Sequence, residues 1–157
     1  MAKLTEIVSK ERVLVDGDGR LAPDKAAALS VLAGLLAPAL GSTEATVVAL
    51  LRQREELQST GIGDGVAVPH AAMDGVAQRA AAMLLCPRGL AFDAIDGRPV
   101  HILIGVVGPR SATGEHLRVL ARISKLLRDE ATRAELIGSV DAEAAFALIS
   151  ARDDAIG

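Results

Sequence analysis

The residue best placed for chemistry is His70, which follows a proline at the end of a short apolar run. Residues 65–68 predict a strand, and Pro69 ends its hydrogen bonding because proline has no N–H and a fixed φ. A histidine held at a strand end suits nucleophilic chemistry, since rigid elements position groups better than loops do. The alternative is a surface histidine in a turn, and these residues alone leave both open.

The segment before His70 is rich in glycine. Gly61, Gly63 and Gly65 allow a ligand to approach the backbone closely, and we expect them, together with Thr60, to bind phosphate. The run lacks the Gly-Lys-Ser/Thr ending of a Walker loop, so the expected phosphate site is not a nucleotide loop of that kind.

His116 is the second candidate, and it lies in the first turn of a predicted helix. Apolar residues follow it at helical spacing: Val119, Leu120, Ile123 and Leu127. This spacing puts His116 on the buried side of the helix. It is then either a core histidine with one hydrogen bond or a polar group aimed at a site beside the helix N-terminus, where free N–H groups favour an anion such as phosphate.

Arg54 is the third candidate and lies on the predicted helix that leads into the glycine-rich run. An arginine there could pair bidentately with a phosphoryl oxygen. Spacing alone favours a solvated charge beside Glu55 or Glu56. His101 alternates within an apolar strand, and we expect it to be structural.

Helices and strands that alternate along the chain must position these residues. We expect a short helix or turn over 4–9, strands over 12–15, 65–68, 80–86 and 100–107, and helices from about Pro23 to near Pro38, from Ser42 or Thr43 to about Gln58, and over about 112–128, 130–137 and 141–151. The near-continuous apolar character of 100–107 predicts a central strand. The order predicts an α/β single-domain sandwich with helices on the sheet.

Composition excludes several classes of function. The 157 residues fit one domain, 1–157, with an aliphatic core, because half are hydrophobic and Trp and Tyr are absent. A net charge of −3 without a basic cluster argues against nucleic acid and anionic membranes. The lone Cys86 excludes an internal disulfide and a Cys-rich zinc site.

The location that we expect is the cytoplasm. The first residues show no apolar signal segment. The uncharged stretch 26–43 approaches the length of a membrane span, but its alanines, glycines and Pro38 predict a buried core helix instead. No cluster of residues requires a metal ion or another cofactor.

Four segments, in order along nearly the whole chain, resemble the EIIA domains of the bacterial phosphotransferase system, fructose–mannitol class. They are residues 52–57 (RQREEL), 59–70 (STGIGDGVAVPH), 92–100 (FDAIDGRPV) and 115–127 (EHLRVLARISKLL). Among subtypes, the chain is most similar to the stand-alone nitrogen-type EIIA.

The resemblance implies a role for each matching residue. His70 would accept a phosphoryl group from the phosphocarrier HPr, or from its nitrogen-branch counterpart, and Arg54 and His116 would flank the phosphohistidine. The apolar run Ala71, Ala72 and Met73 would contact the partner, although Met73 could equally pack into the core. The fold that the resemblance implies is a mixed β-sheet flanked by helices, for which we expect about five strands, and it agrees with the α/β sandwich expected from the residues.

Two positions depart from the family pattern. Family members often have Arg or Lys where this chain has Ala72, and Asp where it has His101. Loss of the basic group could weaken the phosphoryl site or partner docking, but it does not remove the nucleophile.

Three functions remain open at this point. The phosphorylated protein could act on a regulatory target protein, or it could pass the group to a fructose- or mannitol-type EIIB in sugar uptake. A different class is a metal-dependent hydrolase that uses His70, His101 and His116, although their spacing lacks an HExxH pattern.

Overall fold

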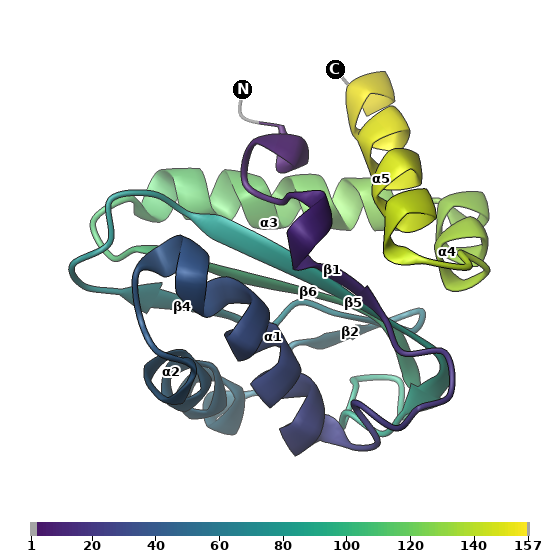
Figure 1. Cartoon of the computed structure of the whole chain (residues 1–157), viewed down its shortest axis with the longest axis horizontal. Helices are drawn as coiled ribbons and strands as arrows, with labels where there is room; N and C mark the ends of the chain where they lie inside the picture. The colour runs from purple at the N-terminus through teal and green to yellow at the C-terminus, as the bar shows by residue number, and fades with distance from the viewer. Residues whose placement is uncertain (1–2, 157) are drawn as a thin grey trace.

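A mixed six-stranded sheet lies between two layers of helices in the computed structural model, which describes residues 3–156 (Figure 1). The strands are β1 (Val13–Val15), β2 (Gly61–Gly63), β3 (Val66–Ala67), β4 (His70–Met73), β5 (Ala80–Leu90) and β6 (Val100–Pro109). The helices are η1 (Leu4–Glu6), η2 (Lys10–Arg12), α1 (Lys25–Leu40), α2 (Glu44–Leu57), α3 (Thr113–Leu127), α4 (Glu130–Ile137) and α5 (Ala142–Ile156). The expected α/β sandwich is confirmed, with six strands rather than about five.

The sheet is built around β6, which pairs with β5 on one side and with β3 and β4 on the other. Both β3 and β4 run parallel to β6, and the Pro69 carbonyl between them accepts the Val106 N–H at 2.9 Å. His70 is therefore the first residue of a strand, not a residue beyond a strand end as we expected. Pro69 has no N–H to donate, but its carbonyl still accepts a hydrogen bond from β6. Strand β4 therefore continues the pairing with β6 that β3 began.

Side-chain alternation gives the sheet two separate cores. On one face, α1 and α2 cover Ala82, Leu84 and Leu103. On the other, α3, α4 and α5 cover Met83 and Ile104. Successive strand residues point to opposite faces, so each buried strand supplies both cores.

The ends of α1 and α2 follow capping rules. Asp24 accepts the Ala27 N–H, so α1 begins at Lys25, two residues later than Pro23 suggested, and Gly41 ends it at φ 63°. The helix continues through Pro38, which we expected to end it. A proline in the last turn removes only its own N–H donor, so the hydrogen bonds donated by the residues after it can still form. Thr43 caps α2 as expected.

The C-terminal part of the chain forms the second helical layer. Helix α3 runs along the sheet, and α4 and α5 follow at one end, close to where the described N-terminal residues lie (Figure 1).

Strand β5 continues through Pro87, where we expected a stop, with a register shift against β6 between Leu85 and Leu90. Within residues 3–156, no helix is long and apolar enough to cross a membrane.

Candidate functional site

The sheet register brings His70 and His116 together. His70 is paired with Val106, which belongs to the core under α3, so its side chain lies on the α3 side of the sheet. His116 lies in the first turn of α3, and the two ring centroids are 5.4 Å apart at an interplanar angle of 51°. Both rings are half-buried, which leaves one side of the pair open to a partner.

The His70 ring is held by the main chain. Its Nδ1 lies 2.7 Å from the Val68 carbonyl oxygen. Because a carbonyl only accepts, Nδ1 carries the proton and the lone pair is left on Nε2. Burial lowers the pKa of His70 below its ordinary value. The ring is therefore neutral near pH 7, with a free nucleophilic nitrogen.

The His116 ring is held by a side chain and takes the opposite tautomer. Arg79 Nε donates to His116 Nδ1 at 3.3 Å, so the proton of the neutral ring lies on Nε2. Burial, followed by the nearby His70 and Arg79, lowers the pKa of His116 from 6.5 to about 4. The fold thus places a neutral ring with an N–H donor beside the His70 ring.

Arg79 is a site residue that the sequence did not reveal. Its side chain is only 1% exposed, and besides His116 it contacts Glu115 at 3.2 Å and the Ala112 carbonyl at 3.1 Å. Gly108 leaves room for it, since a Cβ there would lie 2.6 Å from Arg79 Nε. A single arginine before an apolar run carries no signal of its own, and only the fold shows its neighbours.

Arg54 lies near the pair without touching it. Its Nη1 donates to the Gln58 carbonyl at 2.9 Å, at the end of α2. Its positive charge lowers the pKa of His70, after the larger effect of burial. A half-exposed guanidinium with a single backbone partner can turn toward an anion on His70 at small cost.

The family comparison decides the class. The model of the family described as "Phosphoenolpyruvate-dependent sugar phosphotransferase system, EIIA 2" matches residues 6–152. The chain belongs to this family. It is 35% identical over 150 residues to a nitrogen regulatory protein of Pseudomonas aeruginosa, covering 95% of this chain and 96% of that one. A nitrogen regulatory protein of Bradyrhizobium diazoefficiens is 33% identical over 147 residues, with 94% of each chain covered.

Solved structures agree with the family assignment. The nitrogen regulatory protein IIA-Ntr from Neisseria meningitidis superimposes with a TM-score of 0.84 at 33% identity, over 93% of this chain and 98% of that one. The mannitol IIA from Escherichia coli shares the fold, with a TM-score of 0.73 at 24% identity over 90% and 97% of the two chains.

The expected phosphate-binding residues of this EIIA domain do not line the histidine pair as a group. Thr60 uses its N–H and hydroxyl on the Glu55 carboxylate, at 2.8 and 2.7 Å. The Gly61 N–H donates to Ser59 Oγ, and its missing Cβ admits Ala94. These donors are therefore taken by the protein itself.

Gly63 and Gly65 lie farther from the pair, at the turn between β2 and β3. Their φ values of 96° and 78° explain why glycine occurs there. Gly65 lies against His101. We expected both glycines near a bound phosphate, but β3 separates them from His70 because the turn is at its opposite end.

The three histidines do not gather into one site. His101 lies five positions before Val106 on β6, and its Nδ1 faces the Cys86 carbonyl at 3.2 Å. Between residues 3 and 156, no group of three or more His, Cys, Asp or Glu is arranged to hold a metal ion. Nothing in the structure or the comparisons supports the hydrolase alternative.

The expected docking residues of the EIIA domain divide between core and surface. Ala71 is 8% exposed and belongs to the core under α1 and α2, so little of its side chain is open to the partner contact that we expected. It pairs with Val107, and the pleat turns it away from His70. Ala72 is half-buried, and Met73 both packs against that core and lines a surface hollow of about 320 Å³.

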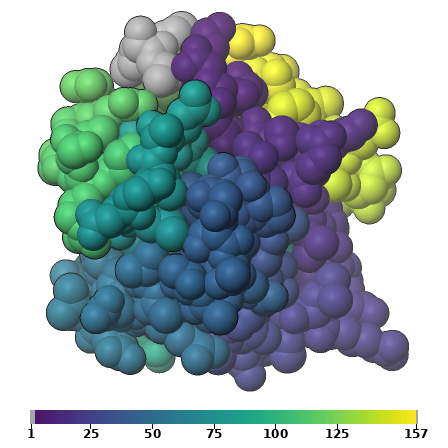
Figure 2. Space-filling view, turned by 60° about the vertical axis from the view of Figure 1, so that its left-hand side comes forward, coloured from purple at the N-terminus to yellow at the C-terminus, as the bar shows by residue number. Residues whose placement is uncertain are grey.

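A basic group does lie beside Ala72, although it comes from another strand end. Arg110 follows β6, and its guanidinium contacts the Ala72 carbonyl at 3.4 Å and Asp74 at 3.0 Å. The segment after β4 lies on the surface between α3 and the blue helices α1 and α2 (Figure 2). Arg110 therefore brings a positive charge close to the position where family members often carry Arg or Lys.

Proposed function

We propose that this protein is a phosphoryl carrier whose His70 accepts a phosphoryl group from an HPr-type phosphocarrier. The observation behind this proposal is the pair of complementary tautomers. The His70 ring has its lone pair on Nε2, and the neighbouring His116 ring carries its proton on Nε2, with the ring centroids 5.4 Å apart. Residues 1–157 would form one EIIA-type domain, of which Met1, Ala2 and Gly157 lie outside the described residues, and it would work in the cytoplasm.

The transfer step needs only groups of the two proteins. The His70 Nε2 lone pair forms the new N–P bond, and the bond between phosphorus and the donor's histidine nitrogen breaks, returning its electron pair to that nitrogen. The His70 ring then carries positive charge, and its Nδ1–H keeps its bond to the Val68 carbonyl. Catalysis rests on alignment and on donors to the phosphoryl oxygens, for which we propose His116 and Arg54.

The regulatory branch is the better supported of the two relay functions. The nitrogen regulatory proteins of Pseudomonas aeruginosa and Bradyrhizobium diazoefficiens match over almost their whole length, whereas the fructose-specific EIIABC component of Bacillus subtilis is 29% identical and only 24% of it is covered. We propose that the phosphorylation state of His70 controls binding to a regulatory target protein. Donation to a sugar EIIB is the second candidate.

The docking surface would surround the histidine pair. Ala72 and Met73 follow His70 on β4, and Leu117 follows His116 with 60% of its surface exposed. Exposed apolar side chains beside a reactive group suit a partner that must exclude water during transfer.

Incubation with phosphoenolpyruvate, Enzyme I and HPr, followed by mass mapping of acid-labile phosphate, tests the proposal. We expect one phosphoryl group on His70 and none on the His70→Ala variant. The matched control is His101→Gln, which should accept phosphate as the parent does. Label that persists on His70→Ala would refute the assignment.

A second assay separates the two branches. Phosphorylated protein is mixed with purified fructose- and mannitol-type EIIB, and both states are used to capture binding partners. A partner retained by one state only, without transfer to EIIB, supports regulation. Rapid transfer to EIIB supports sugar uptake.

A further inference from the structure

The Val68 carbonyl fixes the tautomer of His70, so whatever holds this carbonyl also controls the nucleophile. Val68 lies between β3 and β4 and is 5% exposed. Its N–H donates to the Thr60 carbonyl at 3.0 Å. This bond anchors Val68 on the side before its Cα, so the position from which its carbonyl is presented depends on where Thr60 is held.

Thr60 is held by a carboxylate from the preceding helix. Glu55, in the last turn of α2, accepts both the N–H and the hydroxyl of Thr60. The helix ends in an extended Gln58, with no backbone capping bond from that residue. The Glu55 side chain therefore ties the end of α2 to the strand path that leads to His70.

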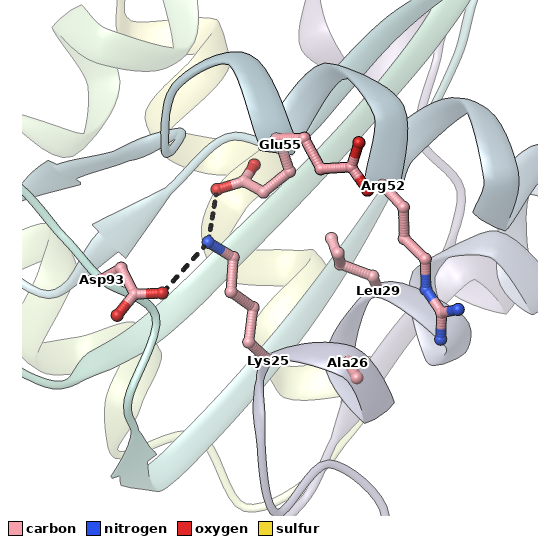
Figure 3. A pocket seen from close by; sticks show the side chains of 7 residues that line it. Lys25, Ala26, Leu29, Arg52, Glu55 and Asp93 are labelled. Atoms are coloured by element: carbon pink, nitrogen blue, oxygen red, sulfur yellow. Dashed lines mark ion pairs between the residues drawn. The ribbon is translucent and has the colours of Figure 1, made fainter.

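Glu55 is buried as an ion, and Lys25 is its counter-charge. The Glu55 side chain is 4% exposed, and Lys25 Nζ lies 3.1 Å from its Oε1. Figure 3 shows Lys25 reaching from the start of α1 to a point between Glu55 and the exposed Asp93, which lies 3.6 Å away. A buried carboxylate needs such compensation, and here a cation and two donors provide it.

The pocket of about 470 Å³ around this ion pair opens on the α1–α2 side of the sheet. Lys25 and Glu55 line it together with Glu56, while His70 faces α3 on the opposite side. The ion pair therefore acts through the backbone and not by contact with the phosphoryl group.

We infer that Glu55 and Lys25 are positioning residues for the phosphoacceptor, acting in the order Lys25, Glu55, Thr60, Val68 and His70. Their ion pair holds Thr60, the Thr60 carbonyl anchors Val68 through its N–H, and the Val68 carbonyl keeps the proton on His70 Nδ1. This inference rests on the proposed function for its rate effect, but its structural part concerns the free protein alone.

Titratable groups from two helices, α2 and α3, lie around the His70 ring. Arg54 and Glu55 lie on α2, and His116 lies on α3. Glu55 raises the pKa of His70, and Arg54 lowers it. Removal of the Glu55 charge should therefore lower the pKa of His70 as well as loosen its tautomer.

The test compares Glu55→Gln with Glu56→Gln, the same change at the exposed neighbour in the same pocket. Glutamine can accept one Thr60 donor but loses the charge toward Lys25. Nitrogen-15 spectra of the histidine rings should show a mixture of tautomers and a lower His70 pKa in Glu55→Gln only. Transfer from HPr should slow about tenfold, because small misplacements of a reacting group are costly.

Thr60→Val keeps the inference testable if Glu55→Gln does not fold. This change removes the hydroxyl donor at nearly constant shape, and we expect the same spectral change in smaller measure. Parent-like tautomer and pKa in all folded variants would overturn the inference. If the parent protein itself accepts no phosphate, the proposed function fails, and the spectra still decide the positioning role.

Discussion

The two histidines of the site are held in different ways. His70 is fixed by a main-chain carbonyl, which depends on the register of β3, β4 and β6. His116 is fixed by the buried side chain of Arg79. One ring therefore depends on the sheet as a whole, and the other on a single side chain.

This difference fits the separate roles that we propose for the two histidines. A nucleophile must keep its lone pair in place through many cycles, and a carbonyl locked in a sheet suits this requirement. A donor to the phosphoryl oxygens needs one N–H, which a side-chain partner can fix. The comparison predicts that substitutions at or beside His116 lower the rate of phosphoryl transfer but leave the acceptor nitrogen unchanged. Substitutions that displace the Val68 carbonyl should instead change the tautomer of His70 itself.

Among variants that keep His70, the largest effect is expected for His116→Ala. Loss of one donor to a transferring group commonly costs about 10²-fold. Phosphate should still map to His70, but transfer onto and from it should slow by about this factor in rapid-quench assays. His116→Gln keeps an N–H donor and should recover part of the loss. Transfer at the parent rate would make His116 a core residue only.

Arg54→Lys should have a smaller effect. Lysine keeps the charge but loses the planar fork, and a charged hydrogen bond of roughly 1.5 kcal/mol corresponds to about a tenfold slower transfer. The melting temperature should stay unchanged, because Arg54 bonds only to the Gln58 carbonyl. Arg52→Lys on the same helix is the control. Equal transfer rates for the parent, Arg54→Lys and Arg52→Lys would show that Arg54 is only a solvated charge.

Arg79→Met should slow phosphoryl transfer less than Arg54→Lys does. His116 would then sample both tautomers, so the competent fraction falls and the rate drops about two- to fivefold. Loss of the nearby positive charge should also raise the pKa of His116 from about 4. Titration by NMR measures this shift, with the exposed Arg110→Met as control. A His116 pKa that does not move would contradict the assigned contact.

The smallest effect concerns stability and pH. The pKa of His116 is lowered from 6.5 to about 4 in the folded protein, so the unfolded chain binds the proton first. The free energy of unfolding should therefore fall by roughly 1–3 kcal/mol as pH decreases from 6.5 to 4, since one pKa unit corresponds to about 1.4 kcal/mol. Urea titrations of His116→Gln should show a shallower decrease. Identical pH profiles would contradict a buried neutral ring.

Much of the fold could be predicted because its signals are local. Apolar runs gave β5 and β6, and Thr43 gave the start of α2. Pro38 and Pro87 misled because each local penalty is one hydrogen bond, which tertiary packing outweighs. The short strands β2 and β4 were missed because their pairing with distant segments, not their composition, defines them.

The site was only partly predictable for the same reason. His70 and His116 stood out by type and place, and the sheet does bring them together. Arg79 and Glu55 act through partners that are distant in sequence or separated by a turn, so no spacing reveals them. Ala71 was misplaced because the expected strand ended before His70, which left the alternation of β4 out of the argument.

The nitrogen that carries the phosphoryl group tests the account most directly. Nitrogen-15 and phosphorus-31 NMR of the protein phosphorylated through HPr identifies that atom. We predict phosphate on Nε2 of His70, with the proton still on Nδ1 toward the Val68 carbonyl. Phosphate on Nδ1 of His70, or on any other residue, would contradict the central claim that the sheet selects the nucleophilic nitrogen.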